Sequence, residues 1–342
     1  MSFNLVKNMV DKNNLPNYIL FYGSEEYFID YSIKYIKSTY IDISYEDMNY
    51  VEFENTNSLK DYFEFSETFP FMSEKKVSVL KEANFLTSTG SLDKIDEDQL
   101  IKNMDSNESC ITIFVIKDGK PDSRKKIVKK LKEKKAIYEF KRLNERELTN
   151  YIVNEFKQQN RSISMFDANY MANNCGYLEY ESQVSLYHLN NEINKIISFI
   201  QERKKVTTAD VEDLMIKSVE SNIFKLIDYL CECNKENAFE ILDEMLLNNT
   251  PEQFIIHMVV RQYRMLYQYI LLQNKGYSYN EIMNKMNIKN FVARKLSIQS
   301  KNLNIETLEH YMMKFMELDR KIKTGEIDSR IGLELLISGI IK

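Results

Sequence analysis

The chain has 342 residues, of which 46 are Lys or Arg and 51 are Asp or Glu, giving a formal net charge of −5. It contains only 8 Gly and 4 Pro, far below the roughly 12% of an average protein, while 44% of its residues are hydrophobic. This composition excludes collagen-like, mucin-like and wholly disordered chains. The negative charge argues against a protein that mainly coats nucleic acid. The length predicts two or three domains, and the scarcity of Gly and Pro predicts that they are mostly helical.

The four Cys and three His are scattered without chelating spacings. Neither a disulfide framework nor a metal site is therefore expected. No run of 18 apolar residues occurs, and the N-terminus lacks the charged start and apolar stretch of a signal peptide. We expect a soluble, cytoplasmic protein with no membrane segment.

The first 140 residues alternate between strand-like and helix-like patterns. Strands are expected at 18–22, 48–53, 77–80, 110–116 and 136–140, and helices at 24–37, 59–65 and 124–135. Ser24, followed by Glu25 and Glu26, is the expected N-cap region of the first of these helices. Strands that are regularly separated by helices predict a parallel sheet with helices on both faces.

After residue 140 the strand signals almost vanish. Helices are expected to open at residue 144 and to cover 165–174, 184–201 and 211–215, and the chain is expected to be helical from 218 to its end, with breaks near Asn234, Asn249, Asn274 and Gly325. The sequence therefore predicts an α/β domain at 1–142, a small helical domain at 143–217 and a larger helical domain at 218–342.

A strand followed by a glycine turn and a helix is where many α/β proteins hold phosphate. A P-loop needs G-x-x-x-x-G-K-[ST], because backbone amides and a lysine must neutralise the phosphates. Here the turn is Gly23-Ser-Glu-Glu-Tyr-Phe-Ile, with one glycine, no lysine and two carboxylates. Strand 77–80 runs into Lys81-Glu82 rather than into the paired acids that bind magnesium. We therefore expect no nucleotide, metal or other cofactor, and no catalysis by this chain.

Seven short sequence segments, taken together in their order along the chain, indicate a resemblance to a known family. They are 18–29 (Tyr-Ile-Leu-Phe-Tyr-Gly-Ser-Glu-Glu-Tyr-Phe-Ile), 69–76, 122–126, 139–144, 221–224, 261–264 and 322–330. Together they resemble the delta-subunit family of the bacterial DNA polymerase III clamp loader, within the AAA+ superfamily, over nearly the whole chain. The abundance of Lys, Asn, Ile and Tyr is similar to that of Gram-positive, low-GC members. The resemblance implies an AAA+-like first domain without a nucleotide site, a lid-type second domain and a collar-forming third domain.

The resemblance also implies a function in DNA replication. It implies a non-catalytic subunit of the polymerase holoenzyme that binds the ring-shaped sliding clamp (beta) and opens it for loading onto primed DNA. The implied protein partners are the tau/gamma and delta-prime subunits, with which the chain would form a heteropentamer. The chain would also contact primer-template DNA without sequence preference. Its implied location is the replication fork on the nucleoid, away from membranes. Two rival hypotheses stay open, namely a degenerate AAA+ ATPase and a helical DNA-binding adaptor in replication or repair.

Residues 67–72, Glu-Thr-Phe-Pro-Phe-Met, place three large apolar side chains around a proline between a helix and a strand. One interpretation packs them under the sheet, and the other exposes them as an anchor for a partner's pocket. Family members insert a hydrophobic pair from this position into the clamp, so the resemblance implies clamp binding by Phe69, Pro70, Phe71 and Met72. Phe71 matches the aromatic member of the pair. Pro70 stands where many relatives have leucine, which leaves Phe69 or Met72 as the second anchor.

Residues 117–135 hold ten Lys or Arg against three acids. Such a run is either the solvated face of a helix, with Ile127, Val128 and Leu131 as its buried stripe, or a contact with DNA phosphates. The candidate DNA contacts are Arg124, Lys125, Lys126, Lys129 and Lys130.

Three arginines are candidates for the collar interface. Arg261 and Arg264 are three residues apart and so share one helix face, where they either pair with acids of this chain or cross the interface. Arg330 lies near Gly325, together with Asp319 and Lys323. It either contacts a neighbouring subunit or takes part in pairing at a helix–helix turn.

Overall fold

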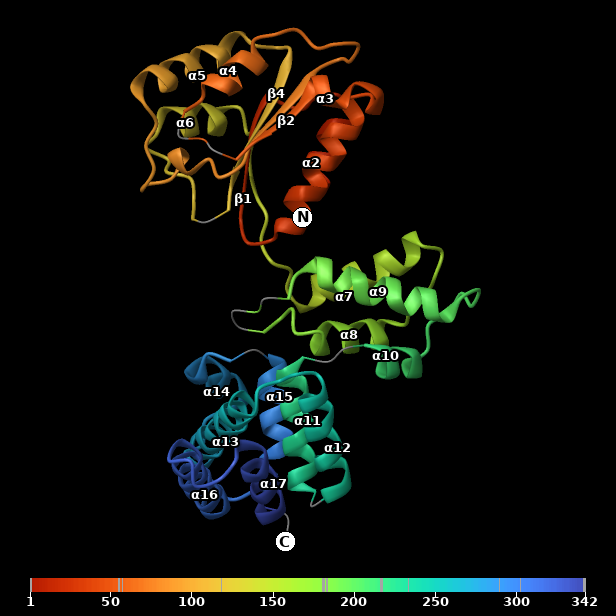
Figure 1. The fold of residues 1–342 in the computed structure, drawn as a ribbon, viewed down its shortest axis with the longest axis vertical. Coiled ribbons are helices and arrows are strands. Elements are labelled where there is room, and N and C mark those ends of the chain that lie inside the picture. Colours follow the sequence, from red (N-terminus) through yellow and green to blue (C-terminus); the bar gives the residue numbers. More distant parts are fainter. Residues whose placement is uncertain are drawn as a thin grey trace. The chain divides into compact units, whose positions relative to one another are not determined.

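A computed structural model describes residues 2–54, 56, 58–117, 119–179, 182, 184–215, 218–232, 234–288, 290–301 and 303–340. The chain divides into two compact units, Met1–Leu143 with Ser185–Tyr187, and Asn144–Val184 with His188–Lys342 (Figure 1). The boundary predicted between residues 217 and 218 falls inside the second unit, and Ile216 and Lys217 lie outside the described residues, so the three-domain division stays a prediction. None of the described helices is both long and apolar enough to cross a membrane.

The first unit is built on a parallel sheet. Its strands are β1 (Tyr18–Tyr22), β2 (Tyr50–Phe53), β3 (Lys76–Leu80), β4 (Cys110–Ile116) and β5 (Ile137–Glu139), in the order β2-β3-β4-β1-β5. All neighbouring strands are parallel, with Leu20 of β1 opposite both Phe114 of β4 and Ile137 of β5. The residues of β3 and β4 are all buried, as expected for central strands covered on both faces. The predicted parallel sheet is confirmed.

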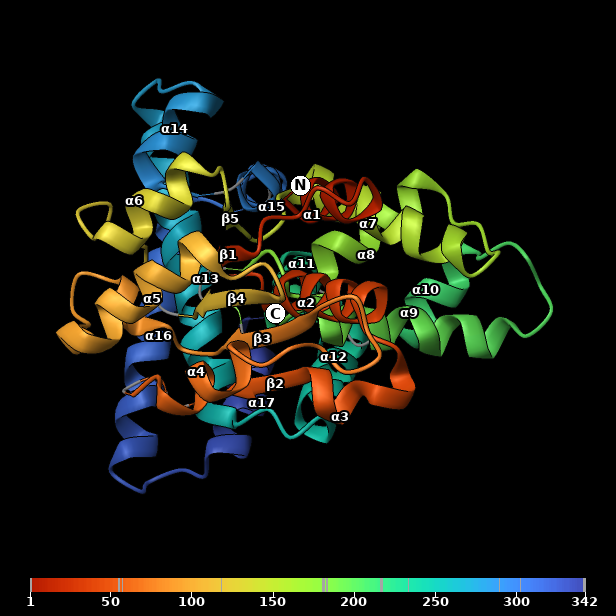
Figure 2. The ribbon, with the colours of Figure 1, turned by 90° about the horizontal axis from the view of Figure 1, so that it is seen from above.

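Helices cover both faces of the sheet, as predicted. The helices of this unit are α1 (Ser2–Asp11), α2 (Glu26–Tyr40), α3 (Glu46–Asn49), α4 (Lys60–Ser66), α5 (Lys94–Ser106) and α6 (Lys126–Glu133), with short 3-10 turns η1 (Ile43–Tyr45) and η2 (Asn84–Leu86). Figure 2 shows α1 and α2 on one side of the sheet, and α4, α5 and α6 on the other. A buried apolar cluster fills the second side, with Leu20 and Phe114 from the sheet and Tyr62 and Leu131 from the helices.

Two local predictions in this unit are wrong, and two helices were missed. The strand expected from residue 48 begins at Tyr50, because Met48 and Asn49 belong to α3. Helix α2 begins at Glu26 with Glu25 in the N-cap position, so Ser24 is not the cap. Helices α1 and α5 were not expected, and their few buried apolar positions, among them Val10 and Leu100, explain the weak signal.

The parallel arrangement separates the two candidate regions of this unit. The turn that starts at Gly23 follows β1 and therefore lies at the carboxyl edge of the sheet, as do the loops after β3 and β4. Residues 67–75 lead from α4 into the first residue of β3 and therefore lie at the amino edge. The turn that resembles a phosphate site and the apolar loop are thus at opposite edges of one sheet.

The second unit is entirely helical in its described residues apart from one isolated bridge. Its helices are α7 (Glu145–Gln158), α8 (Met165–Asn174), α9 (Leu186–Ile200), α10 (Thr208–Leu214), α11 (Val219–Cys231), α12 (Lys235–Leu247), α13 (Glu252–Asn274), α14 (Tyr279–Met286), α15 (Asn290–Gln299), α16 (Ile305–Lys323) and α17 (Ser329–Ile340). Asn144 and Thr207 form capping boxes at the starts of α7 and α10. One apolar core joins α11, α12, α13, α16 and α17, and includes Ile227, Leu242, Tyr263, Phe315 and Leu333.

Two breaks in this unit were not predicted. Asn287 ends α14 in the left-handed conformation, and Asn304 caps α16 by accepting a hydrogen bond from the backbone of Thr307. Both residues are asparagines, which tolerate left-handed backbone and act as N-caps. The all-helical second half that the sequence predicted is confirmed.

Candidate functional site

The glycine of the first βα turn is required by the backbone of Phe140, the residue that follows β5. Gly23 has φ +131°, and a Cβ atom on it would lie 2.2 Å from the carbonyl oxygen of Phe140. That carbonyl accepts a hydrogen bond from the backbone N–H of Glu25 at 3.0 Å. The close approach of two chain segments therefore explains this glycine without a phosphate.

A cavity of about 140 Å³ lies at the carboxyl edge beside Gly23, and Glu26, Asp30, Lys81 and Lys117 contribute to its lining. Known ligand pockets are typically about 300–1,000 Å³. Both lysines already face acids, since Lys81 pairs with Glu52, which raises the pKa of Lys81, and the Nζ of Lys117 lies 3.6 Å from Glu82. The turn therefore presents carboxylates and neutralised cations at the place where a phosphate chain would need free cations.

The loop at the amino edge exposes large apolar side chains. Phe69 is 86% exposed, Met72 is 71% exposed and Phe71 is 49% exposed, while Pro70 is half-buried. We call Phe69, Phe71 and Met72 the apolar tip. Met72 has φ +52°, a left-handed conformation that turns the chain sharply after Phe71. The alternative that these side chains pack under the sheet is therefore wrong.

Buried polar groups hold both ends of this loop. The Nζ of Lys76, a residue only 5% exposed, donates to the carbonyl oxygen of Phe65 at 2.9 Å and to the hydroxyl of Thr68. Asn49 is fully buried, and its side chain hydrogen-bonds to both backbone polar groups of Phe71. Neither residue was identified from the sequence, although a lysine that opens an apolar strand was an available signal.

Helix α5 supports the start of the loop. Gln99 and Asn103 donate to the Glu67 carboxylate at 2.9 and 3.1 Å, and these hydrogen bonds lower the pKa of Glu67. The side-chain amide of Asn107, just after α5, donates to the carbonyl oxygen of Ser66 at 2.7 Å. The backbone on which the apolar tip stands is thus tied to a neighbouring helix.

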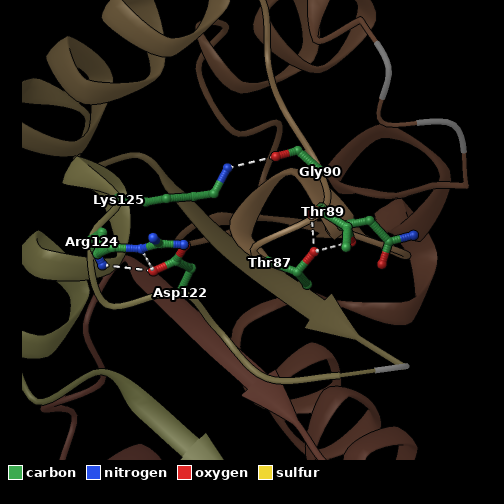
Figure 3. A network of polar contacts seen from close by, with 7 residues as sticks. Thr87, Thr89, Gly90, Asp122, Arg124 and Lys125 are labelled. Carbon is green, nitrogen blue, oxygen red and sulfur yellow. Dashed lines mark hydrogen bonds and ion pairs between the residues drawn. The ribbon is translucent and has the colours of Figure 1, made fainter.

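Three of the five candidate DNA contacts are engaged within the chain. The Arg124 guanidinium pairs with Asp122 at 2.7 Å and holds the pKa of that carboxyl at about 2 (Figure 3). The Nζ of Lys125 donates to the carbonyl oxygen of Gly90 at 2.7 Å (Figure 3). Lys130 pairs with Asp105. The contact of Lys125 joins the segment before α6 to the loop after β3, where Thr87 also bonds to Asn84 and Thr89. The pair of Lys130 and Asp105 joins α6 to α5.

The other two basic candidates are open to solvent. Lys126 and Lys129 are exposed on α6, and no ion pair or hydrogen bond of their side chains is found among the described residues. Ile127, Val128 and Leu131 form the buried stripe of this helix, as predicted. Asp118, one of the three acids of the run, lies outside the described residues. The helix begins at Lys126 rather than at Arg124, because the Asp122 carboxylate accepts the backbone N–H of Arg124 in a turn.

The three collar candidates differ in their surroundings. Arg261 and Arg264 are exposed on α13, and no carboxylate of the described part of the chain lies within 4.0 Å of either. Arg330 of α17 lies 3.6 Å from Asp243 of α12 and 3.3 Å from Glu334. Arg330 therefore takes part in pairing within the chain, the alternative that the sequence left open, and Lys323 likewise pairs with Asp319.

Two family models match the chain in order. Residues 18–141 match "DNA polymerase III, delta subunit", and residues 220–340 match "DNA polymerase III delta subunit, C-terminal domain". The chain is 27% identical over 346 residues to DNA polymerase III subunit delta of Bacillus subtilis (strain 168), covering 100% of this chain and 97% of that protein. It is 23% identical over 324 residues to a probable DNA polymerase III subunit delta of Aquifex aeolicus (strain VF5), covering 93% and 89%.

The fold matches as well. The solved structure of a Bacillus subtilis DNA clamp loader delta protein superposes with a TM-score of 0.63 at 26% identity, and the match covers 100% of this chain and 99% of that one. The three comparisons agree on the same protein family: the family models match in order, one relative matches over its full length, and the fold is similar. The chain therefore belongs to the family of DNA polymerase III delta subunits, which are subunits of the clamp loader.

Proposed function

We propose that this chain binds the sliding clamp through the apolar tip and holds its ring open for loading onto primed DNA. The observation that supports the proposal most directly is the exposure of three large apolar side chains on one short, well-supported loop. Exposed aromatic groups of this kind fill pockets on partners and contribute most of an interface's binding energy. At the carboxyl edge of the same sheet, the lysines that line the cavity beside Gly23 already face acids. A larger cavity of about 540 Å³ at this edge is lined by Glu54 and Glu82, with no lysine or arginine among its described lining residues. The tip is therefore the better candidate.

Opening a ring in this way uses differential binding instead of bond chemistry. A ring that is open only rarely becomes trapped when a protein binds the open form more tightly. Shifting an equilibrium from 1:99 to 99:1 needs a preference of about 10⁴-fold, or about 5.5 kcal/mol. Two or three apolar anchors at about 2 kcal/mol each reach this range when they are engaged in the open ring and not in the closed one.

Clamp binding can be tested with one substitution and one matched control. We expect Phe71→Ala to weaken the affinity for purified clamp by about 2 kcal/mol, or about 30-fold, as measured by calorimetry on the full chain. Leu247→Ala removes an apolar side chain that is 82% exposed in the second unit and should leave the affinity unchanged. Equal affinity of the Phe71 variant, with an unchanged unfolding curve, would rule out the proposed site.

Ring opening needs a separate measurement. Clamp that has been loaded onto nicked circular DNA should be released when this chain is added in excess, and Phe71→Ala should slow the release. Binding without release would leave the tip as a clamp-binding element and contradict the opening step. Turnover of ATP by the isolated chain would instead favour the degenerate ATPase.

We extend the proposal to the other subunits and to DNA. The exposed face of α13 that carries Arg261 and Arg264 has no acid partner among the described residues and so suits a contact with a neighbouring tau/gamma or delta-prime subunit. Arg330 is a weaker candidate because its guanidinium already faces Asp243 and Glu334. Lys126 and Lys129 suit a weak, sequence-independent contact with DNA phosphates.

A further inference from the structure

Both polar atoms of the Asn49 side chain form hydrogen bonds, with the loop that carries the apolar tip and with the residue that precedes its own helix. Its Oδ1 accepts the backbone N–H of Phe71 at 2.8 Å, and its Nδ2 donates to the carbonyl oxygen of Phe71 at 2.7 Å. The same Nδ2 lies 3.1 Å from the hydroxyl of Ser73 and 3.0 Å from the carbonyl oxygen of Tyr45. Only a side chain with a donor and an acceptor side by side can bond both polar groups of one residue in this way.

These contacts hold the backbone of Phe71, and a ring contact holds its side chain. With both backbone groups bonded to a buried side chain, the ring packs edge-on against Tyr45, with centroids 5.6 Å apart and planes at 74°. The ring remains 49% exposed in this position. An unsupported loop would have to lose its conformational freedom when a partner binds, and that loss lowers affinity.

We infer that Asn49 is a positioning residue that presents Phe71 to the partner in a preorganised conformation. The inference rests on the proposed clamp-binding function. It does not make Asn49 an interface residue, because its side chain is fully buried, and the inference gives it an effect on the partner only through the position of Phe71.

A double-mutant cycle tests the inference on the full chain. Asn49→Ala should weaken clamp binding about tenfold in the wild-type background and less than twofold in the Phe71→Ala background, because the ring that Asn49 positions is then absent. Independent losses in the two backgrounds would overturn the inference, since a general destabilisation adds to the effect of Phe71→Ala. Ser73→Ala removes one acceptor of the same amide but neither contact with Phe71, and it should bind within twofold of wild type.

Hydrogen exchange of the Phe71 amide supplies a readout that does not depend on the clamp. The amide should be protected in the wild type and should exchange at least tenfold faster in Asn49→Ala, while the amides of β3 keep their protection. Unchanged exchange would overturn the inference. If Asn49→Ala fails to fold, as unprotected β3 amides would show, Asn49→Ser takes its place in both measurements. If Phe71→Ala binds the clamp normally, the proposed function fails, and the exchange rates still decide whether Asn49 fixes the loop.

Discussion

The ammonium of Lys76 makes two contacts with Phe65: its Nζ donates a hydrogen bond to the Phe65 carbonyl oxygen at 2.9 Å, and it lies 4.1 Å from the centroid of the Phe65 ring. Phe65 is in the last turn of α4, where a carbonyl has no partner within the helix and a cation is favourable. The buried ammonium therefore caps the C-terminus of α4 and holds the backbone at which the loop of the apolar tip begins.

We expect Lys76→Ala to lower the free energy of unfolding by about 2 kcal/mol, because it removes a charged donor and leaves a gap at a buried position. Lys76→Met keeps most of the volume and removes the desolvated charge, so it should lower the stability less than Lys76→Ala does. Urea unfolding of the full chain measures both changes. Equal losses for the two variants would contradict the packing part of this account.

The same lysine predicts a pH dependence. Burial lowers the pKa of Lys76 below its usual 10.5. Between the lowered value and 10.5 the unfolded chain binds more protons than the folded chain, so stability gains a contribution as pH rises through that window. The difference in unfolding free energy between wild type and Lys76→Met should therefore shift in favour of the wild type as pH rises toward 10.5. A difference that does not change with pH would show that Lys76 titrates normally in the fold.

Gly23→Ala tests the explanation of the first βα turn. Its new Cβ would meet the Phe140 carbonyl oxygen at a distance of 2.2 Å, in addition to the strain of a positive φ. We expect a loss of about 3 kcal/mol or more in unfolding free energy. Gly276 has φ +82° with no atom within 4 Å of a built Cβ, so Gly276→Ala should cost only the backbone strain, about 1 kcal/mol. Similar losses for the two variants would argue against the contact with Phe140.

The second anchor of the apolar tip is predicted to be Phe69. Its ring is 86% exposed and offers more apolar area than Met72. We expect Phe69→Ala to weaken clamp binding about tenfold, the effect of about 1.4 kcal/mol, and Met72→Ala to weaken it less. Calorimetry with purified clamp measures both, and the reverse order would assign the second anchor to Met72.

The proposed DNA contact predicts a change in salt dependence. Each phosphate contact contributes about −0.9 to the slope of log affinity against log salt concentration for duplex DNA. Replacing both Lys126 and Lys129 with Ala should therefore make the slope shallower by about 2, measured by fluorescence anisotropy with primed DNA. Arg124→Ala should change it less, because Asp122 already neutralises that guanidinium. An unchanged slope in the double variant would place any DNA contact elsewhere.

Much of the first unit could be predicted from local patterns. The runs at Tyr18–Tyr22 and Cys110–Ile116 are strands because continuous apolar residues suit a sheet that is buried on both faces. The composition of the Gly23 turn predicts that a phosphate site is lacking, since charge and glycine spacing are properties of the sequence, and this stays a prediction. The concentration of Phe69, Phe71 and Met72 beside Pro70 was visible in the same way.

The tertiary structure alone decided how these residues are used. The backbone of Phe71 is bonded to Asn49, 22 residues earlier in the chain, and Lys130 is paired with Asp105, 25 residues earlier. Residues this far apart leave no periodic signal, because only folding brings them together. The sequence by itself determined the strands and the chemistry of each loop, whereas the tertiary structure decided which polar side chains are bonded to distant residues and which side chains stay exposed.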